Sequence, residues 1–234
     1  MTVARLAELL DPFLRNPLDA PGREQAVLSP AQLEHISTYI DMLLRWNARV
    51  NLTAIRGADD IVTRHFGESL FTARHLFPRN AHSPMPSNAK EHRPTTNDRV
   101  SVADVGSGAG FPGLPIKLWA PQISLTLIES NQKKAAFLRE VARALTLTDV
   151  NIQNARAESL PASSHSVVTL RAVERFESIL PIAAQLVCPS GRLALLIGAT
   201  QRRPAQSIVP GVIWSEPVPI PRSNSRILLV GNLP

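Results

Sequence analysis

The chain has 234 residues, of which 44% are hydrophobic, with one cysteine and a formal net charge of +6 at pH 7. This length and apolar content exclude a disordered chain, and one cysteine excludes an internal disulfide, so we expect a globular protein of a reducing compartment, the cytoplasm. No run approaches the roughly 20 apolar residues that span a bilayer, no signal peptide is recognisable, and the positive charge favours a polyanionic partner such as RNA or DNA.

The N-terminal third is predicted to be helical. Ser29-Pro30-Ala31-Gln32 has the form of a capping box with proline at the first helical position. Apolar residues then recur at helical spacing, which predicts a helix over 30–48, and a second amphipathic helix is expected over 59–77. We therefore assign residues 1–77 to a small N-terminal helical cap.

Residues 78–99 differ in composition from everything around them. They contain four prolines and two histidines and no Val, Ile, Leu or Phe, so they offer little apolar area to offset the entropy of ordering. We expect a flexible linker that is dispensable for folding. His82 and His92 have no partners at metal-ligand spacing, so no metal site is expected there.

A strand followed by glycines is the most informative feature of the chain. The β-branched run over 100–105 contains Asp104 and leads into Gly106-x-Gly108-x-Gly110, which is typical of a buried parallel strand turning into a helix beside a nucleotide. The dinucleotide fingerprint needs a glycine where Phe111 stands, which disfavours NAD. The pattern instead resembles motif I of the S-adenosylmethionine (SAM) methyltransferases, in which this loop packs beside the amino-acid end of the cofactor.

A carboxylate follows at the place where nucleoside cofactors are held. The alternating run over 123–128 predicts a second strand, and it ends in Glu129, about twenty residues beyond the glycines. Such a carboxylate can accept hydrogen bonds from both ribose hydroxyls. The structural alternative is an exposed acid that opens a turn.

The rest of the chain alternates strands and helices. A helix is expected over 131–146, strands near 149–153, 166–170 and 192–197, and a helix over 174–187. Two last strands, 212–218 and 227–230, leave no room for a helix between them, so they predict a C-terminal antiparallel hairpin. The expected fold is α/β and Rossmann-like, with a mostly parallel sheet, and residues 100–234 form the SAM-binding domain.

Four segments together resemble the RsmG (GidB) family, which methylates N7 of a guanine in 16S ribosomal RNA. In chain order they are Trp46-Asn47-x-x-x-Asn51-Leu52-Thr53, Arg64-His65-x-x-Glu68-Ser69, the run from Asp104 to Pro115, and Arg171-Ala172-Val173. The resemblance covers roughly residues 30–200. It implies a cytoplasmic, SAM-dependent enzyme that acts on the decoding region of 16S rRNA, as free RNA, the 30S subunit or an assembly intermediate; we expect a monomer with no membrane or protein partner.

The resemblance also implies site residues. The expected cofactor contacts are Gly106, Gly108, Phe111, Glu129, Ala157, Glu158 and Arg171. The candidate substrate contacts in the cap are Asn51, Arg64 and His65. Each has a structural alternative: Phe111 as a core residue, Glu158 as a solvated acid, Arg171 as the cap of a carbonyl or the partner of Glu174, and the polar residues of the cap as links to the catalytic domain.

The chain departs from the family pattern at several positions. Leu170 stands where a serine is usual, and Ile197 stands where a lysine is usual. Both changes concern expected substrate contacts, and Arg202 and Arg203 are the candidate replacements. Glu68 replaces the commoner aspartate, and the segment 78–99 is longer than usual.

The expected chemistry needs no catalytic base. Guanine N7 carries a lone pair and no proton, so alignment with the sulfonium methyl can supply most of the catalysis and no catalytic residue is assigned. N7 of a paired A-form helix lies in a deep, narrow groove, so the target should lie in a loop or be unstacked. Two alternatives remain at this point: a SAM-dependent enzyme acting on a small molecule, and a non-catalytic RNA-binding relative of the fold. An NAD oxidoreductase fails on the glycine spacing and would be revived only by NADH binding.

Overall fold

A computed structural model describes residues 1–15, 27–79, 99–173 and 175–234. Within these residues eight strands form one sheet in the order β3-β2-β1-β4-β5-β8-β6, and β7 pairs with β8 beside β6. The strands from β3 to β5 are parallel, whereas β8 runs antiparallel to β5, β6 and β7. Their bounds are β1 Ser101–Val105, β2 Ser124–Ile128, β3 Val150–Gln153, β4 His165–Arg171, β5 Val187–Gly198, β6 Ile213–Trp214, β7 Val218–Pro219 and β8 Arg226–Asn232. The mostly parallel sheet and its antiparallel end confirm the predicted fold class.

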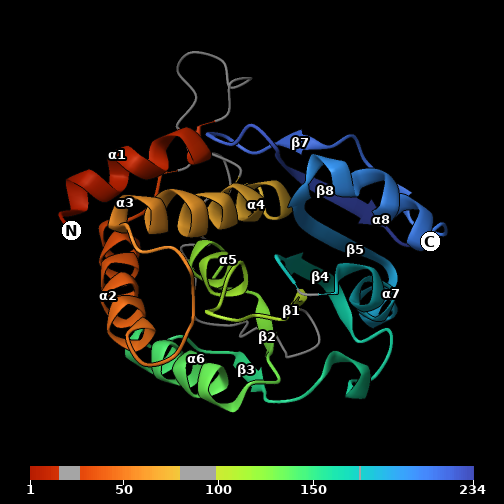
Figure 1. Cartoon of the computed structure of the whole chain (residues 1–234), viewed down its shortest axis with the longest axis horizontal. Helices are drawn as coiled ribbons and strands as arrows, with labels where there is room; N and C mark the ends of the chain where they lie inside the picture. The colour runs from red at the N-terminus through yellow and green to blue at the C-terminus, as the bar shows by residue number, and fades with distance from the viewer. Residues whose placement is uncertain (16–26, 80–98, 174) are drawn as a thin grey trace, which may run out of the picture.

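Helices cover both faces of this sheet (Figure 1). Because side chains alternate along a strand, Val102 of β1 enters the core beneath one set of helices and its neighbour Ala103 enters the opposite core. The first core is covered by α1 Val3–Leu14, α2 Pro30–Asn47, α4 Glu68–Leu76, α5 Gly113–Trp119 and α6 Gln132–Ala144. The second is covered by α7 Phe176–Leu186 and α8 Arg202–Ile208. The cap helices therefore share one core with a face of the sheet.

The predicted capping box begins α2. The Ser29 hydroxyl accepts from the Gln32 N–H at 3.2 Å, and the Gln32 side chain accepts from the Ser29 N–H at 2.9 Å. The Gln32 amide also donates to the Leu118 carbonyl at the end of α5, at 2.5 Å. Helix α1 precedes this region and was not predicted, although its buried residues Leu6, Leu10 and Phe13 contribute to the first core.

The helix predicted over 59–77 is present but is not uniform. It consists of α3 Ala58–Asp60, the π-helix η1 Ile61–Gly67 and then α4. Gly67 lies in the wide turn against α1, where an added Cβ would come within 2.6 Å of the Phe13 ring. π-turns inside α-helices are frequently found at functional sites.

Most of the predicted linker 78–99, including His82 and His92, lies outside the described residues, so its character and the domain boundaries at 77 and 99 stay predictions. The segment begins at an anchored residue. The Arg79 guanidinium lies 3.7 Å from the centre of the Trp119 ring and donates to the Trp119 carbonyl at 2.6 Å.

The C-terminal antiparallel pairing is confirmed, with the turn at 221–225 joining β7 to β8, but the strand predicted over 212–218 is two short strands, β6 and β7. Helix α8, which was not predicted, lies between β5 and β6 and packs against α7. None of the described helices is long and apolar enough to cross a membrane.

Candidate active site

One cavity of about 650 Å³ opens at the carboxyl ends of β1, β2 and β4, between the sheet and the cap. Ligands of open α/β sheets bind at this edge. The seven predicted cofactor residues all line it: Gly106, Gly108, Phe111, Glu129, Ala157, Glu158 and Arg171. Arg64 and His65 of the cap line it as well, whereas Asn51 is exposed and does not.

The glycine loop forms one wall of the cavity. Gly106, Gly108 and Gly110 have φ values of 69°, 56° and 90°, a region that residues with a Cβ rarely adopt. The N–H groups of Gly106 and Ser107 donate to the Ile128 carbonyl at 3.0 and 3.1 Å, which ties the loop to the end of β2. An added Cβ on Gly106 would lie 2.8 Å from Val173, so the loop also packs closely on the segment after β4.

Asp104 holds the loop in place from behind. Its side chain is fully buried and accepts from the Gly113 N–H at 3.1 Å and from the Thr169 hydroxyl at 2.8 Å. Burial raises the pKa of Asp104 from 3.8 to about 7, although these hydrogen bonds oppose the rise. Because Asp104 is not among the lining residues, it joins β1, β4 and the start of α5 rather than contacting a ligand.

Glu129, directly after β2, holds the glycine loop through its carboxylate. One oxygen accepts from the Gly108 N–H at 2.9 Å and the other from the Asn131 N–H at 2.8 Å, and the residue is only 7% exposed. A carboxylate has about four lone-pair sites, so each oxygen retains room for one further donor. The ribose role of Glu129 stays a prediction, with the carboxylate already oriented for it.

The Ala157-Glu158 pair lies across the cavity from the glycine loop. It forms the 3-10 turn η2 Ala157–Ser159, with Ala157 buried and Glu158 exposed. The Asn154 amide, which the sequence analysis missed, donates to the carbonyls of Glu129 and Ser130 at 2.9 and 3.1 Å and so ties this segment to the end of β2.

Phe111 is both a core residue and a wall of the cavity. Its ring lies parallel to Tyr39 of α2, with centroids 5.3 Å apart, stacks on His65 at 4.7 Å and meets Phe66 edge-on at 5.1 Å. At 6% exposure it still lines the cavity, so the two readings of this position are compatible.

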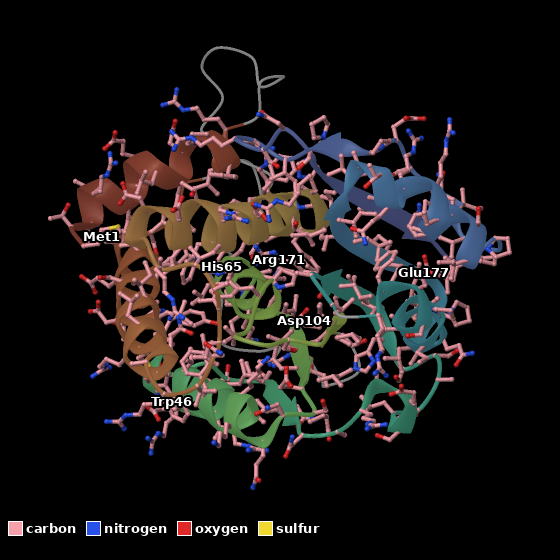
Figure 2. All side chains as sticks on the ribbon, viewed as in Figure 1. Met1, Trp46, His65, Asp104, Arg171 and Glu177 are labelled. Carbon is pink, nitrogen blue, oxygen red and sulfur yellow. The ribbon has the colours of Figure 1, made fainter. Side chains whose placement is uncertain are left out.

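Arg171 reaches the cap rather than the glycine loop. It donates to the Arg64 carbonyl at 2.5 Å, to Nδ1 of His65 at 3.1 Å and to a carboxylate oxygen of Glu68 at 3.2 Å. Figure 2 shows His65 and Arg171 side by side below α4. The guanidinium therefore does cap a carbonyl, and Glu174, the alternative partner, lies outside the described residues.

His65 is held neutral in this arrangement. Burial and the nearby charges of Arg171, Arg64 and Arg226 lower its pKa from 6.5 to about 3. Since Arg171 donates to Nδ1, the ring proton is on Nε2 and is donated to the Thr53 hydroxyl, 2.8 Å away. Both ring nitrogens are thus occupied.

Two further residues of the site were missed. Arg226, at the start of β8, pairs with the Glu68 oxygen that Arg171 leaves free and lines the cavity. Asn47, rather than Asn51, shapes the cap loop: its side chain accepts from Leu52 and Thr53 N–H and donates to the Thr53 carbonyl, all near 2.9 Å. Asn47 was visible in the motif, whereas nothing in the sequence linked Arg226 to Glu68.

The residues that depart from the family pattern lie outside the lining of the cavity. Leu170 and Ile197 are buried in the core beneath α7 and are not lining residues. Arg202, at the start of α8, lies 3.5 Å from Glu216, and neither Arg202 nor Arg203 is among the residues that line the cavity. Their role as replacement substrate contacts stays a prediction.

The residues present fit a nucleoside cofactor with an amino-acid end. The cavity volume is within the range of small-molecule sites, bare backbone faces it at the glycines, and the Glu129 carboxylate stands at its edge. Among the described residues no group of His, Cys, Asp and Glu could hold a metal ion.

Comparisons with known proteins identify the family of the chain. The family model described as rRNA small subunit methyltransferase G matches residues 32–82 and 88–207. Relatives named ribosomal RNA small subunit methyltransferase G are 38% identical over 74% of this chain and 73% of the protein from Halorhodospira halophila, and 36% identical over 87% of this chain and 84% of the protein from Roseiflexus sp.. The crystal structure of a ribosomal protein L11 methylase from Lactobacillus delbrueckii subsp. bulgaricus matches with a TM-score of 0.56 and 10% identity, over 73% of this chain and 79% of that one, which shows a shared fold. The chain therefore belongs to the rRNA small subunit methyltransferase G family and is a SAM-dependent rRNA methyltransferase.

Proposed function

We propose that this enzyme methylates N7 of a guanosine in an unpaired segment of the decoding region of 16S rRNA, presented by the 30S subunit or an assembly intermediate. The observation that carries the proposal is one continuous cavity, in which the predicted cofactor residues of the sheet edge meet arginines contributed by the cap and by β8. A ribosomal substrate also implies that the enzyme works in the cytoplasm, and we expect it to act as a monomer.

The groups around the cavity suit a nucleophile that carries no proton. His65 is neutral, and both of its nitrogens are engaged. The carboxylates among the described lining residues are Glu129, whose oxygens accept main-chain hydrogen bonds, and the exposed Glu158. The one lining carboxylate without main-chain donors among the described residues is therefore at an exposed position, and guanine N7 needs no base.

Catalysis is then mainly orientation. When bound, SAM supplies a methyl group that its sulfonium makes electrophilic. The chain's own residues hold the two reactants in line: the glycine loop and Glu129 on one side, and the cap, fixed to β4 through Arg171, on the other. Prepaid orientation of this kind can contribute several kcal/mol to the barrier, on the order of 7–11 for the best-aligned systems.

The mouth of the cavity carries positive charge that suits an RNA backbone. Arg64, Arg156 and Arg175 are exposed lining residues, and Lys134 and Arg226 are half-buried ones. Cations at the rim attract phosphates and leave the base free to enter. Since N7 of a paired helix is inaccessible, the substrate that fits is a nucleotide in a loop or one that is splayed out.

The test is methyl transfer from labelled SAM to ribosomal RNA from a strain that lacks this gene. We expect label in 16S rRNA, in 30S subunits or their precursors, and chain cleavage at one guanosine after borohydride and aniline treatment, which is specific for N7-methylguanosine. RNA from the parent strain, already methylated, is the control. Label at another atom, or label that needs no ribosomal RNA, would contradict the proposal; the second result would favour a small-molecule substrate. SAM binding without any transfer would favour a non-catalytic RNA-binding relative.

A further inference from the structure

Tyr39 connects the cap to the glycine loop through a hydrogen bond. It is the only tyrosine of the chain, lies in α2 and is fully buried. Its hydroxyl donates to the carbonyl of Ala109, the residue between Gly108 and Gly110. Packing alone does not require this hydroxyl, because a phenylalanine ring would fill the same space, whereas a buried hydroxyl is costly unless it finds an acceptor.

The rest of the loop is held by its own domain, and the Ala109 carbonyl is held by the cap. The Gly106 and Ser107 N–H groups bond to β2, the Ser107 hydroxyl donates to the Asp104 carbonyl at 2.8 Å, and the Gly110 N–H donates to the Ser107 carbonyl at 2.6 Å. Among the described residues, the donor to the Ala109 carbonyl comes from α2. The orientation of this peptide group is thus set across the boundary between cap and sheet.

The third glycine of the motif serves this contact. A Cβ on Gly110 would lie against the Tyr39 hydroxyl, closer than real Cβ atoms approach, and 2.6 Å from Leu114. Gly108, by comparison, would meet only the Gly106 carbonyl oxygen, at 3.8 Å. Besides its φ of 90°, the packing of α2 and α5 on the loop thus leaves no room for a side chain at Gly110.

The aromatic neighbours of Tyr39 fix its ring, and so hold its hydroxyl against the Ala109 carbonyl. The Tyr39 ring stacks on Phe111 with an interplanar angle of 5° and meets Phe66 edge-on at 5.1 Å. Burial raises the pKa of Tyr39 well above its ordinary range, so the phenol keeps its proton and remains a hydrogen-bond donor.

We infer that Tyr39 is a positioning residue, through which the helical cap sets the shape of the loop that receives the amino-acid end of the cofactor. This inference rests on the cofactor site of the proposed function. It means that the cap does more than contact RNA, because a displacement of α2 changes how the methionyl part of SAM is held.

The test compares two ligands on one variant. S-adenosylhomocysteine carries the amino-acid end, and methylthioadenosine lacks it. In Tyr39→Phe the Ala109 carbonyl loses its donor, and we expect the Kd of S-adenosylhomocysteine by calorimetry to rise at least about fivefold, the lower end of the cost of a buried group left unpaired. The Kd of methylthioadenosine should change less than about twofold, because it makes no use of that end of the site.

Thr72→Val is the matched control. It also removes one buried cap hydroxyl that donates to a main-chain carbonyl, that of Glu68 at 3.0 Å, but in α4 and away from the loop. Both variants should lose similar thermal stability, and Thr72→Val should bind both ligands like the wild type.

Three results would overturn the inference: equal weakening of both ligands in Tyr39→Phe, no weakening of either, or the same ligand pattern in Thr72→Val. If the wild-type protein binds neither ligand, the proposed cofactor site itself is wrong, and the inference fails with it.

Discussion

The two walls of the cavity are built in different ways. The wall from the sheet edge consists of main chain and of contacts between neighbouring segments: glycines with positive φ and a carboxylate that accepts from N–H groups 2 and 21 residues away. The wall from the cap consists of side chains that meet partners 103 to 158 residues away, around Glu68. The hydrogen bonds of Glu129 in the first wall join segments close in the sequence, whereas those of the second wall need the whole domain, including β8. We therefore expect damage to the first wall to change cofactor affinity, and damage to the second to change stability and rate.

The largest expected effect is on the cap wall. Glu68→Ala removes the carboxylate that pairs with the guanidinium groups of both Arg171 and Arg226. These two side chains are only 8% and 26% exposed, so both charges would be left largely buried and without this partner. Removing one partner of a buried ion pair costs about 3–5 kcal/mol, so urea unfolding should show a loss of that order. Glu216→Ala, which removes a pair whose carboxylate is 92% exposed, is the control and should cost less than about 1 kcal/mol. Equal losses in the two variants would show that the ion pairs of Glu68 contribute no more to the free energy of unfolding than an exposed pair does.

The sheet wall is tested by Glu129→Ala. Loss of charge-assisted hydrogen bonds to the expected ribose hydroxyls should weaken SAM binding by about 1.5–3 kcal/mol, or roughly tenfold to a hundredfold in Kd. Adenosine, which carries the same ribose, should lose affinity by a similar factor in calorimetry. Unchanged affinity of a folded variant would show that the ribose lies elsewhere.

The cap wall should also respond to pH through His65. The unfolded chain takes up a proton near pH 6.5, while the folded ring resists it to about pH 3, so the free energy of unfolding falls as the pH drops through this window. Between about pH 8 and 5 this contribution amounts to about 2 kcal/mol. Asp104 acts in the opposite sense, because its pKa of about 7 in the folded state stabilises the fold as the pH falls from 7 towards 3.8.

Because His65 and Asp104 act in opposite senses, the contribution of His65 is measured as the difference in unfolding free energy between the wild type and a His65 variant. Urea unfolding of the wild type and of His65→Gln, at several pH values, should give free energies that converge or cross as the pH falls, since only the wild type carries the His65 penalty. A difference between the two proteins that stays constant from pH 8 to 5 would mean that His65 is protonated as easily in the fold as in the unfolded chain.

The smallest of these effects is expected for Arg171→Lys. A lysine keeps the charge but cannot donate to the Arg64 carbonyl, His65 and Glu68 together, so the cap should sit less firmly on β4. Single-turnover methylation of 30S subunits should fall by about tenfold, with S-adenosylhomocysteine affinity within about twofold of the wild type. A wild-type rate would remove Arg171 from the site, and a parallel loss of affinity would show that the guanidinium holds the cofactor itself.

The same division explains what the sequence could predict. The glycine loop, the strand ending in Glu129 and the capped helix α2 depend on local spacing, and the structure has them where the patterns place them. The pairing of Arg226 with Glu68 joins residues 158 positions apart through the sheet order, which no local pattern encodes. Asn51 was expected in the site because it stands in a matched motif, but Asn47 of the same motif carries the hydrogen bonds, since only its side chain faces the loop that follows α2.

The wide turn η1 has a consequence for the length of the chain at this point. An α-helix turns by about 100° per residue, so one residue more or less rotates everything after it relative to everything before it. In η1 the Glu68 N–H donates to the Thr63 carbonyl, five residues back instead of four. The extra residue in this turn changes the angle at which side chains project before and after it, so that the first part of the helix faces the cavity and the second packs on α5. Removal of a single residue between 61 and 67 would rotate α4 about the helix axis relative to the part of the helix that carries Arg64 and His65. The number of residues in this turn is thus as much a determinant of the site as their identity.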